Sequence, residues 1–324
     1  MSRTLSIVVP LHNEAESLPL VLAALRKSLA DWGGNRETIL VDDGSHDDSW
    51  AQICAAARQY PQTSGIRFTR NFGKEAAILA GLEAATGDWV VVIDGDGQHP
   101  PTLLPKMLER AEDETVAIVA ARKRSRDADG WVTRFVSHTF NRVMHAATGF
   151  DMQGACDYRL MKRPVVNTLL SMPERIRFFR AMTVWTGFRQ VDVDFDVPPR
   201  VAGSTSWTRR SLVRLAITAI TGFSAKPLML VFHMGIVGLG LSVLLALQAL
   251  WSWVSGVAVS GWTSLALLMV FFGSSILVGI GLLGLYLGQL FDEIKARPAY
   301  LVGERMDAQA PTGDHAQEDF SRCQ

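Results

Sequence analysis

The 324-residue sequence contains few cysteines and no excess of charge of either sign. Its three cysteines, Cys54, Cys156 and Cys323, lie far apart without the spacing of metal ligands, which argues against a disulfide framework and against a zinc site. Lys and Arg together number 32, as do Asp and Glu, so the formal net charge is zero. Because no overall basic field would attract a phosphate backbone, the composition argues against nucleic acid as a partner.

Charge is entirely absent from one long stretch of the chain. No Asp, Glu, Lys or Arg occurs in the 65 residues Pro227–Phe291, whereas one membrane-spanning helix needs about 20 residues. We place two spans at 232–253 and 263–290, separated by a short turn with tryptophans beside it, where the headgroup interface would lie. A buried helical hairpin in a soluble protein is the alternative, but an uncharged stretch this long exceeds ordinary core helices. The sequence therefore predicts a two-helix transmembrane hairpin within residues 227–296.

Basic residues lie on both sides of the charge-free run and are absent from the turn between the two spans. Those before it are Arg209, Arg210, Arg214 and Lys226, and those after it are Lys295, Arg297 and Arg305. The positive-inside tendency therefore predicts that both termini are cytoplasmic. The N-terminus also lacks a charged stretch followed by an apolar core and a cleavage site, so we expect the first half of the chain to stay in the cytoplasm.

The two segments that flank the predicted hairpin differ in character. Residues 206–226 place leucine and isoleucine among arginines at close to helical spacing, which predicts an amphipathic helix at the membrane interface. An ordinary surface helix of the soluble domain is the alternative. Residues 297–324 become polar towards their end, and we expect this cytoplasmic tail to be disordered.

The first part of the chain, residues 1–205, alternates apolar β-type runs with amphipathic segments. Strands are expected at Leu5–Val9, Thr38–Val41, Ile66–Phe68, Trp89–Ile93 and Val116–Ala120. Helices are expected near Glu16–Leu29, Ser49–Arg58, Lys74–Ala85 and Leu103–Arg110. This alternation predicts an α/β domain with a mostly parallel, doubly wound sheet. Ligands of such sheets bind beyond the carboxyl ends of the strands, so the residues that follow each strand are the candidates for a site.

Polar residues follow three of the predicted strands. They are Asn13 and Glu14 after the first, Asp42 and Asp43 after the second, and Asp94, Asp96 and Gln98 after the fourth. Clustered carboxylates repel one another, so a cation or a set of hydrogen-bond donors should compensate them. A few oxygen ligands with open coordination positions are what Mg²⁺ or Mn²⁺ requires while it bridges a diphosphate. Each motif alone is common in turns, and it is their occurrence together and in this order that indicates a site.

These motifs, taken in order, resemble the inverting GT-A glycosyltransferases, whose nucleotide-sugar domain carries an Asp-Asp-Gly-Ser turn and an Asp-X-Asp metal motif. The corresponding residues here are 42–45 and 94–96. The chain is similar in particular to the polyprenyl-phosphate branch, which includes undecaprenyl-phosphate glycosyltransferases and dolichyl-phosphate mannose synthase. Further matching segments are Arg70–Glu75, Cys156–Leu160, Arg200–Ser204, Phe223–Leu228 and Arg297–Tyr300. The resemblance covers nearly the whole chain.

The resemblance implies a fold, a reaction and roles for individual residues. The fold would be a GT-A (Rossmann-like) domain, and the reaction would move a sugar from a nucleotide-sugar donor to polyprenyl phosphate with inversion. The implied donor-binding residues are Pro10, Asn13, Glu14, Asp42, Asp94 and Gln98. The implied catalytic residues are Asp96 and Asp157, with Asp96 and Asp94 as ligands of Mg²⁺ or Mn²⁺. The implied acceptor or phosphate contacts are Arg122, Arg200, Ser204 and Lys226. The implied location is a bacterial inner membrane, with the catalytic domain in the cytoplasm.

Several alternatives stay open at this level. A processive polysaccharide synthase of the same fold is one, although its Gln-X-X-Arg-Trp acceptor motif is absent and two spans do not easily enclose a glycan-sized pore. A non-catalytic membrane scaffold is another, against which the intact Asp42, Asp94 and Asp96 argue. Asp157 could act as a general base or could pair with an arginine, and Arg122 could belong to a solvated surface. Glycines in the two spans are compatible with self-association or with packing inside the hairpin.

Overall fold

The computed structural model describes residues 3–123, 155–174, 177–196, 226–256 and 261–308. The chain divides into two compact units. The first comprises Met1–Asn141, Phe150–Ser206 and Arg297–Gln324, and the second comprises Arg142–Gly149 and Trp207–Ala296. The segment after the two apolar helices therefore belongs to the same unit as the N-terminal part of the chain.

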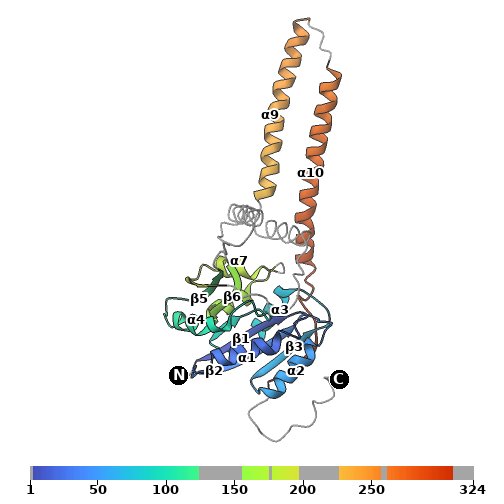
Figure 1. Ribbon diagram of the computed structural model, residues 1–324. Helices are drawn as coiled ribbons and strands as arrows, with labels where there is room; N and C mark the ends of the chain where they lie inside the picture. Colours follow the sequence, from blue (N-terminus) through green and yellow to red (C-terminus); the bar gives the residue numbers. More distant parts are fainter. Residues whose placement is uncertain (1–2, 124–154, 175–176, 197–225, 257–260, 309–324) are drawn as a thin grey trace. The chain divides into compact units, whose positions relative to one another are not determined.

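An eight-stranded sheet forms the centre of the first unit (Figure 1). Its strands are β1 (Thr4–Leu11), β2 (Asn35–Asp42), β3 (Thr63–Phe68), β4 (Trp89–Val92), β5 (Ile118–Lys123), β6 (Ala155–Lys162), β7 (Gln190–Phe195) and β8 (Val302–Met306). Their order across the sheet is β7-β5-β6-β4-β1-β2-β3-β8. Among these described strands, β6 and β8 run antiparallel to their neighbours and the other pairs are parallel. The predicted α/β class with a mostly parallel sheet is therefore confirmed.

Helices connect the parallel strands and cover the sheet. They are α1 (Leu18–Ser28), α2 (Ser49–Gln59), α3 (Lys74–Ala84), α4 (Leu104–Ala111), α6 (Arg163–Ser171) and α7 (Phe179–Trp185), with a short 3₁₀ turn η1 at Pro101–Leu103. The buried residues of α4 recur at the spacing of a single helix face, which is why that face lies on the sheet. Helix α3 packs so closely on β1 that a Cβ added at Gly81 would lie 2.2 Å from Val8 Cγ1. Glycine permits this approach.

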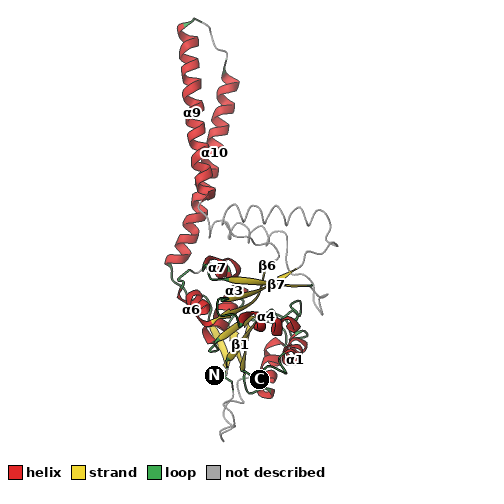
Figure 2. Ribbon diagram, turned by 90° about the vertical axis from the view of Figure 1, so that its left-hand side faces the viewer, coloured by secondary structure: helices red, strands yellow, loops and turns green. Residues whose placement is uncertain are grey.

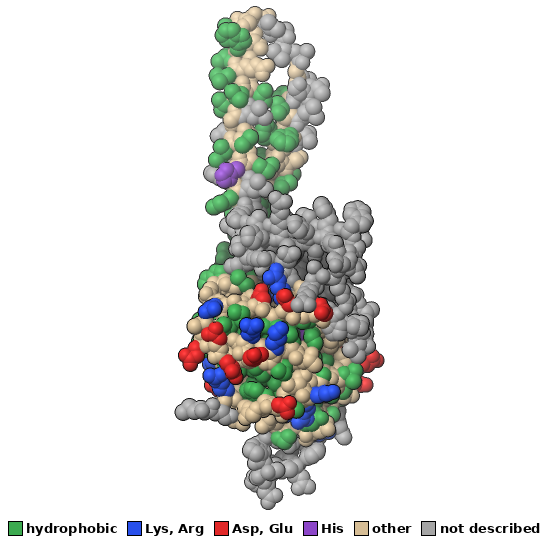
Figure 3. Space-filling view, turned by 60° about the vertical axis from the view of Figure 1, so that its left-hand side comes forward, with side chains coloured by type: hydrophobic (Ala, Val, Ile, Leu, Met, Phe, Trp, Pro, Cys, Tyr) green, Lys and Arg blue, Asp and Glu red, His purple; other side chains and the backbone are tan. Residues whose placement is uncertain are grey.

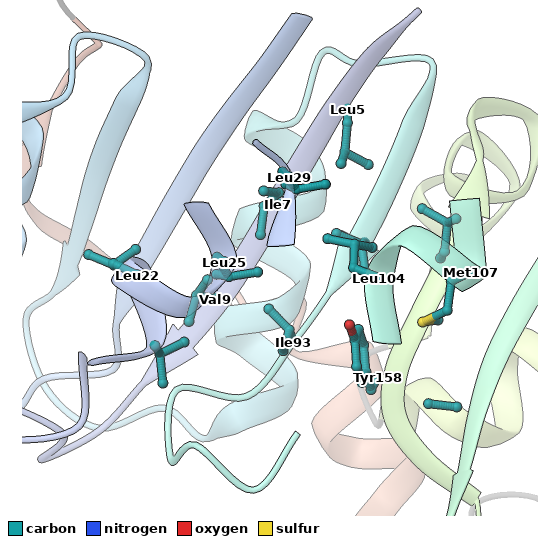
Figure 4. Close-up of a cluster of buried hydrophobic side chains, with 14 of the residues drawn as sticks. Leu5, Ile7, Val9, Leu22, Leu25, Leu29, Ile93, Leu104, Met107 and Tyr158 are labelled. Atoms are coloured by element: carbon teal, nitrogen blue, oxygen red, sulfur yellow. The ribbon is translucent and has the colours of Figure 1, made fainter. Parts of the chain in front are cut away.

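The core of the first unit lies between the sheet and these helices. Leu22 and Leu25 of α1 pack beside Ile7 and Val9 of β1 (Figure 4). Cys54 of α2 belongs to the same cluster of buried side chains.

The C-terminal segment contains a strand that the sequence pattern did not indicate. Strand β8 pairs with β3, and just before it the Thr69 N–H donates to Leu301 O at 3.0 Å. The ring of Tyr300 stacks on Phe68 with the two centroids 4.7 Å apart. The expectation that residues 297–324 form a disordered tail is therefore wrong for 302–306. The polar composition was misleading because an edge strand can leave most of its side chains in solvent.

Two long helices make up the described part of the second unit. They are α9 (Lys226–Val254) and α10 (Trp262–Ile294), and they lie side by side (Figure 2). Within them, His233–Ser252 and Phe271–Gly288 are long and apolar enough to cross a membrane by length and composition. The two apolar helices expected from the charge-free run are therefore present.

Small residues allow α9 and α10 to approach each other. A Cβ added at Gly238 would lie 2.9 Å from Phe272 Cε1, and one added at Gly279 would lie 3.2 Å from Val231 Cγ1. Large apolar side chains are exposed along both helices (Figure 3), as expected of a surface that meets lipid rather than water. The interfacial helix predicted at 206–226 falls on residues that are not described, apart from the start of α9.

Candidate active site

A change of strand order beside β1 marks the edge of the sheet where a ligand would bind. Strand β1 lies between β4 and β2, and all three strands are parallel. Their carboxyl ends open at one edge, where loops leave towards opposite faces of the sheet. The residues at this edge are Asn13 and Glu14 after β1, Asp42 at the end of β2, and Asp94, Asp96 and Gln98 after β4. The fold thus brings to one edge the strand-end residues that the sequence analysis selected.

Asn13 joins the loop after β1 to the loop after β2. Its backbone N–H donates to Ser45 Oγ at 2.9 Å, and its Oδ1 accepts the His46 N–H at 2.9 Å. Its φ of 56° lies in the left-handed region, which asparagine tolerates better than most residues. Pro10, three residues earlier, is a buried member of β1. These contacts hold together the loops after β1 and β2, whose residues were expected to bind the nucleotide-sugar donor.

Glu14 connects the start of α1 with the loop after β4. Its backbone N–H donates to Ser49 Oγ at 2.8 Å. The buried Ser17 hydroxyl lies 2.6 Å from Glu14 Oε2 and 2.7 Å from the carbonyl oxygen of Gly95. These bonds give Glu14 a structural role between two loops, and its contact with the donor stays a prediction.

Asp42 and Asp43 have different surroundings after β2. Asp42 is fully buried, and its Oδ1 accepts the Ser45 N–H at 2.9 Å. Asp43 accepts the backbone N–H groups of Phe72 at 2.6 Å and Gly73 at 2.9 Å. Burial raises the pKa of Asp43, although these two bonds oppose the shift. Asp43 therefore anchors the segment that leads into α3.

Lys74, the first residue of α3, joins two carboxylates at the end of β4 and on β6. Its Nζ lies 2.5 Å from Asp94 Oδ1 and 2.6 Å from Asp157 Oδ2. Strands β4 and β6 are antiparallel with Val92 opposite Arg159, and Asp94 and Asp157 each lie two residues from this pair towards the same end of the two strands. Neighbouring carboxylates repel each other, and Lys74 places a positive charge between these two.

Asp157 is held on its other side by Arg180 of α7. The Arg180 Nε donates to Asp157 Oδ1 at 2.6 Å, and Nη2 donates to Oδ2 at 2.9 Å, which is a two-pronged pairing. Burial by itself would raise the pKa of Asp157, but Lys74 and Arg180 hold that pKa well below its usual range. A carboxylate stabilised this strongly is a weak proton acceptor. The geometry therefore disfavours Asp157 as a general base.

His99 supports Asp94 from the interior. Its side chain is 3% exposed, and its ring lies near Tyr158 with centroids 5.5 Å apart. The Asp94 N–H donates to His99 Nδ1 at 3.3 Å, so that nitrogen carries no proton. Burial lowers the pKa of His99. A neutral imidazole thus holds the loop after β4 without adding charge to the cluster.

Asp96 presents a carboxylate at the same loop. It is half-buried, and its Oδ1 accepts the Gln98 N–H at 2.9 Å. No group of three or more His, Cys, Asp or Glu side chains suited to a metal occurs within the described residues. Asp94 and Asp96 offer hard oxygen donors, which fits an open site completed by phosphate oxygens rather than a closed cage of protein ligands.

The predicted acceptor contacts are less well defined by the structure. Arg122 of β5 lies 3.5 Å from Asp192, and both side chains are exposed, so the pair contributes little to stability. Arg200 and Ser204 lie outside the described residues, as does the side chain of Lys226. A phosphate contact for these four residues stays a prediction.

The sequence analysis did not identify three residues that contact Asp94 or Asp157, namely Lys74, Arg180 and His99. Lys74 lies in a segment that was noted for its resemblance, but nothing in the sequence indicated that it would reach two carboxylates. Arg180 lies on a helix that carried no motif, and His99 follows the fourth predicted strand but was given no role. The expectation that Asp157 could pair with an arginine is met by Arg180, whereas Arg159, two residues further along β6, donates to Thr183 and Gln190.

With this geometry established, comparison with known proteins identifies the family. The model of the family described as glycosyl transferase family 2 matches residues 6–170, which include most of β1, all of β2 to β6 and the loops that carry the carboxylates. The chain belongs to this family and is a glycosyltransferase.

Relatives of similar length match almost the whole chain. It is 33% identical to the prophage bactoprenol glucosyl transferase homolog of Escherichia coli strain K12, over 92% of this chain and 98% of the relative. It is 32% identical to the undecaprenyl-phosphate 4-deoxy-4-formamido-L-arabinose transferase of Aeromonas hydrophila, over 98% of both chains. The glucosyl-3-phosphoglycerate synthase of Mycobacterium tuberculosis, solved with Mn²⁺, UDP-glucose and glycerol 3-phosphate, shares the fold. Its TM-score is 0.51 with 22% identity, covering 68% of this chain and 78% of that one.

The charges of Lys74, Asp157 and Arg180 also affect Glu75, and this leads to a prediction for the pH dependence of stability. Its Oε2 accepts the Phe179 N–H at 2.8 Å, and burial together with the charge of Asp157 raises its pKa from 4.5 to about 7. Because the folded chain holds this proton more tightly than the unfolded chain, the group's contribution to stability is present at acidic pH. That contribution is lost as the pH rises from 4.5 through about 7.

We expect Glu75→Gln, which keeps a hydrogen-bond acceptor but does not ionise, to lose less stability than wild type between about pH 5 and 8. The measurement is the free energy of unfolding in detergent at several pH values. Glu109→Gln, at an exposed position of α4, is the control and should follow wild type. Identical pH profiles for wild type and Glu75→Gln would contradict the assignment.

Proposed function

We propose that this chain transfers a sugar from a nucleotide-sugar donor to the phosphate of a polyprenyl lipid, with inversion at the anomeric carbon. One observation carries the proposal. Similarity to the Aeromonas transferase extends over 98% of both chains and so includes both apolar helices as well as the family domain. That relative is named for undecaprenyl phosphate, and the E. coli relative is named for bactoprenol.

The donor would bind at the carboxyl ends of β1, β2 and β4. We assign its pocket to Pro10, Asn13, Glu14, Asp42, Asp94 and Gln98. Asp96 and Asp94 would hold Mg²⁺ or Mn²⁺, and the mycobacterial structure with Mn²⁺ and UDP-glucose supports a divalent cation. The bound cation would supply positive charge where negative charge develops on the departing nucleoside diphosphate. Asn13 and Asp43 meanwhile keep the surrounding loops in place.

The acceptor would bring its own nucleophile. A phosphate monoester has a second pKa near ~6 and is largely a dianion at neutral pH, so no proton has to be removed before it attacks. This agrees with Asp157, whose two cationic partners make it a poor base. We assign Asp157 to holding Lys74 and Arg180 where they favour anionic reactants. Arg122, Arg200, Ser204 and Lys226 are proposed to contact the acceptor phosphate.

The two apolar helices would place the enzyme where its acceptor is. A polyprenyl chain stays in lipid while its phosphate lies at headgroup level, so a membrane anchor turns a rare encounter into an oriented one. We propose an integral protein of the bacterial inner membrane with both termini in the cytoplasm. The exposed apolar side chains of α9 and α10 support the anchoring, and the flanking basic residues support the orientation.

Purified protein with Mg²⁺, undecaprenyl phosphate and a panel of UDP-, GDP- and dTDP-sugars should form a lipid carrying one sugar, detected by mass analysis. Asp96→Asn removes a charged oxygen ligand and should lower turnover by about 10²-fold or more. Glu109→Asn, an exposed substitution away from the site, should not. Absence of any lipid product with every donor would refute the proposed function, and a product with many sugars would favour a processive synthase.

Asp157→Asn tests the role of the clamped carboxylate. Removing a true general base typically costs about 10²–10⁴-fold in rate and removes the titration of that base from the rate profile. If the acceptor phosphate titrates instead, wild type and variant should share an acidic limb with an apparent pKa near ~6, and the variant should have a lower plateau. Rates of lipid-linked sugar formation from pH 5 to 8 decide between these. Loss of the acidic limb in the variant alone would make Asp157 the base.

Ser255, an exposed residue directly after the end of α9, tests the orientation of the hairpin. A cysteine introduced by Ser255→Cys should react with a membrane-impermeant maleimide added outside spheroplasts. Asp31→Cys, at an exposed position before β2, should react after lysis and not before. Labelling of Ser255→Cys from the cytoplasmic side alone would reverse the proposed topology.

A further inference from the structure

A row of three charged residues crosses the sheet towards its β8 edge. Asp42 at the end of β2 is the register partner of Arg67 on β3, and Arg67 is the register partner of Glu304 on β8. Residues paired in this way lie beside each other on one face of a sheet. Arg67 Nε lies 3.4 Å from Asp42 Oδ2, and Arg67 Nη1 donates to Glu304 Oε1 at 2.7 Å. One guanidinium therefore lies between two carboxylates.

Exposure differs sharply along this row. The side chain of Asp42 is fully buried, whereas those of Arg67 and Glu304 are 32% and 34% exposed. Asp42 Oδ2 makes no hydrogen bond within the described residues, so Arg67 is its nearby compensating charge. A buried carboxylate without such a partner is strongly unfavourable. The position of Arg67 therefore controls the electrostatic surroundings of Asp42.

Glu304 determines that position. Its Oε2 accepts the indole N–H of Trp50 at 2.9 Å, while its Oε1 accepts from Arg67. The Trp50 ring also lies near the guanidinium, with 5.9 Å from Arg67 Cζ to the ring centroid. Since Trp50 is buried on α2, it fixes the glutamate, and the glutamate fixes one end of the arginine.

The distances also show which pairing is the tighter. A charge-assisted N–H···O bond is usually about 2.7–2.9 Å long, which matches the 2.7 Å bond between Arg67 and Glu304. The 3.4 Å separation between Arg67 Nε and Asp42 Oδ2 is longer. Glu304 thus keeps Arg67 close enough to balance the charge of Asp42 without occupying its oxygen.

We propose that Glu304 is a positioning residue for donor binding. It restrains Arg67 beside the buried Asp42 carboxylate, whose Oδ2 is left available to a hydrogen-bond donor of the nucleotide. The inference rests on the proposed function in one respect, namely that Asp42 lines the donor pocket. It gives β8 a part in the donor site, although this strand lies outside the residues 6–170 that the family model matches.

The test compares Glu304→Gln with wild type in the full-length protein in detergent. Losing the carboxylate charge should release Arg67, and the Kd of UDP or GDP in the presence of Mg²⁺ should rise about tenfold by calorimetry. In turnover assays the donor KM should rise similarly, whereas kcat and the acceptor KM should stay within about twofold. Arg305→Gln is the matched control, because it alters the neighbouring exposed residue of the same strand.

A second comparison shows whether Glu304 acts through Arg67. In an Arg67→Gln background, Glu304→Gln should cause no further weakening of nucleotide binding, because coupled residues are not additive. Unchanged Kd in Glu304→Gln, or full additivity in the double variant, would overturn the proposal. So would equal weakening by Arg305→Gln, which would indicate a general effect on β8. Nucleotide binding is measured without acceptor, so missing lipid product would count against the proposed function alone. A wild type that bound neither UDP nor GDP would overturn the donor-site inference.

Discussion

The pairing of Asp157 with Lys74 and Arg180 is the interaction on which the rest of the site depends. The three residues come from β6, α3 and α7, so their ion pairs fasten two helices to the sheet at the same place. A buried carboxylate is tolerated when cations and hydrogen bonds compensate it, and removing one partner leaves an unbalanced charge. Lys74 extends the pairing to Asp94, which ties the loop after β4 to this cluster. The positions of Asp157 and of the loop after β4 are thus set together.

This arrangement has a chemical consequence. With Asp157 held ionised by two cations, the cluster lacks a strong base but offers positive charge on each side of a fixed anion. Such a site suits an acceptor that arrives already ionised, because a phosphate dianion has no proton to lose before it attacks. An alcohol acceptor would require a different set of groups. The chemistry of the acceptor and the electrostatics of the enzyme therefore agree.

Much of the fold could be predicted from the sequence, because β1 to β5 and their helices follow strong apolar periodicities and the carboxylates follow strand ends. The contacts inside the site could not be. Lys74 and Arg180 reach Asp157 across 83 and 23 residues, and no local pattern encodes such a meeting. The short polar strand β8 was missed for a related reason, since its pairing depends on an available sheet edge at β3. Local sequence predicts elements, whereas ion pairs between elements depend on topology.

The central claim is that the lipid phosphate attacks the donor directly, in a single displacement with no covalent sugar–enzyme intermediate. That claim fixes the stereochemistry, because one displacement inverts the anomeric carbon and two displacements restore it. The most direct measurement is the anomeric configuration of the lipid-linked sugar formed from an α-linked nucleotide donor, read from the proton couplings in its NMR spectrum. The account predicts a β-linked product. An α-linked product would contradict it.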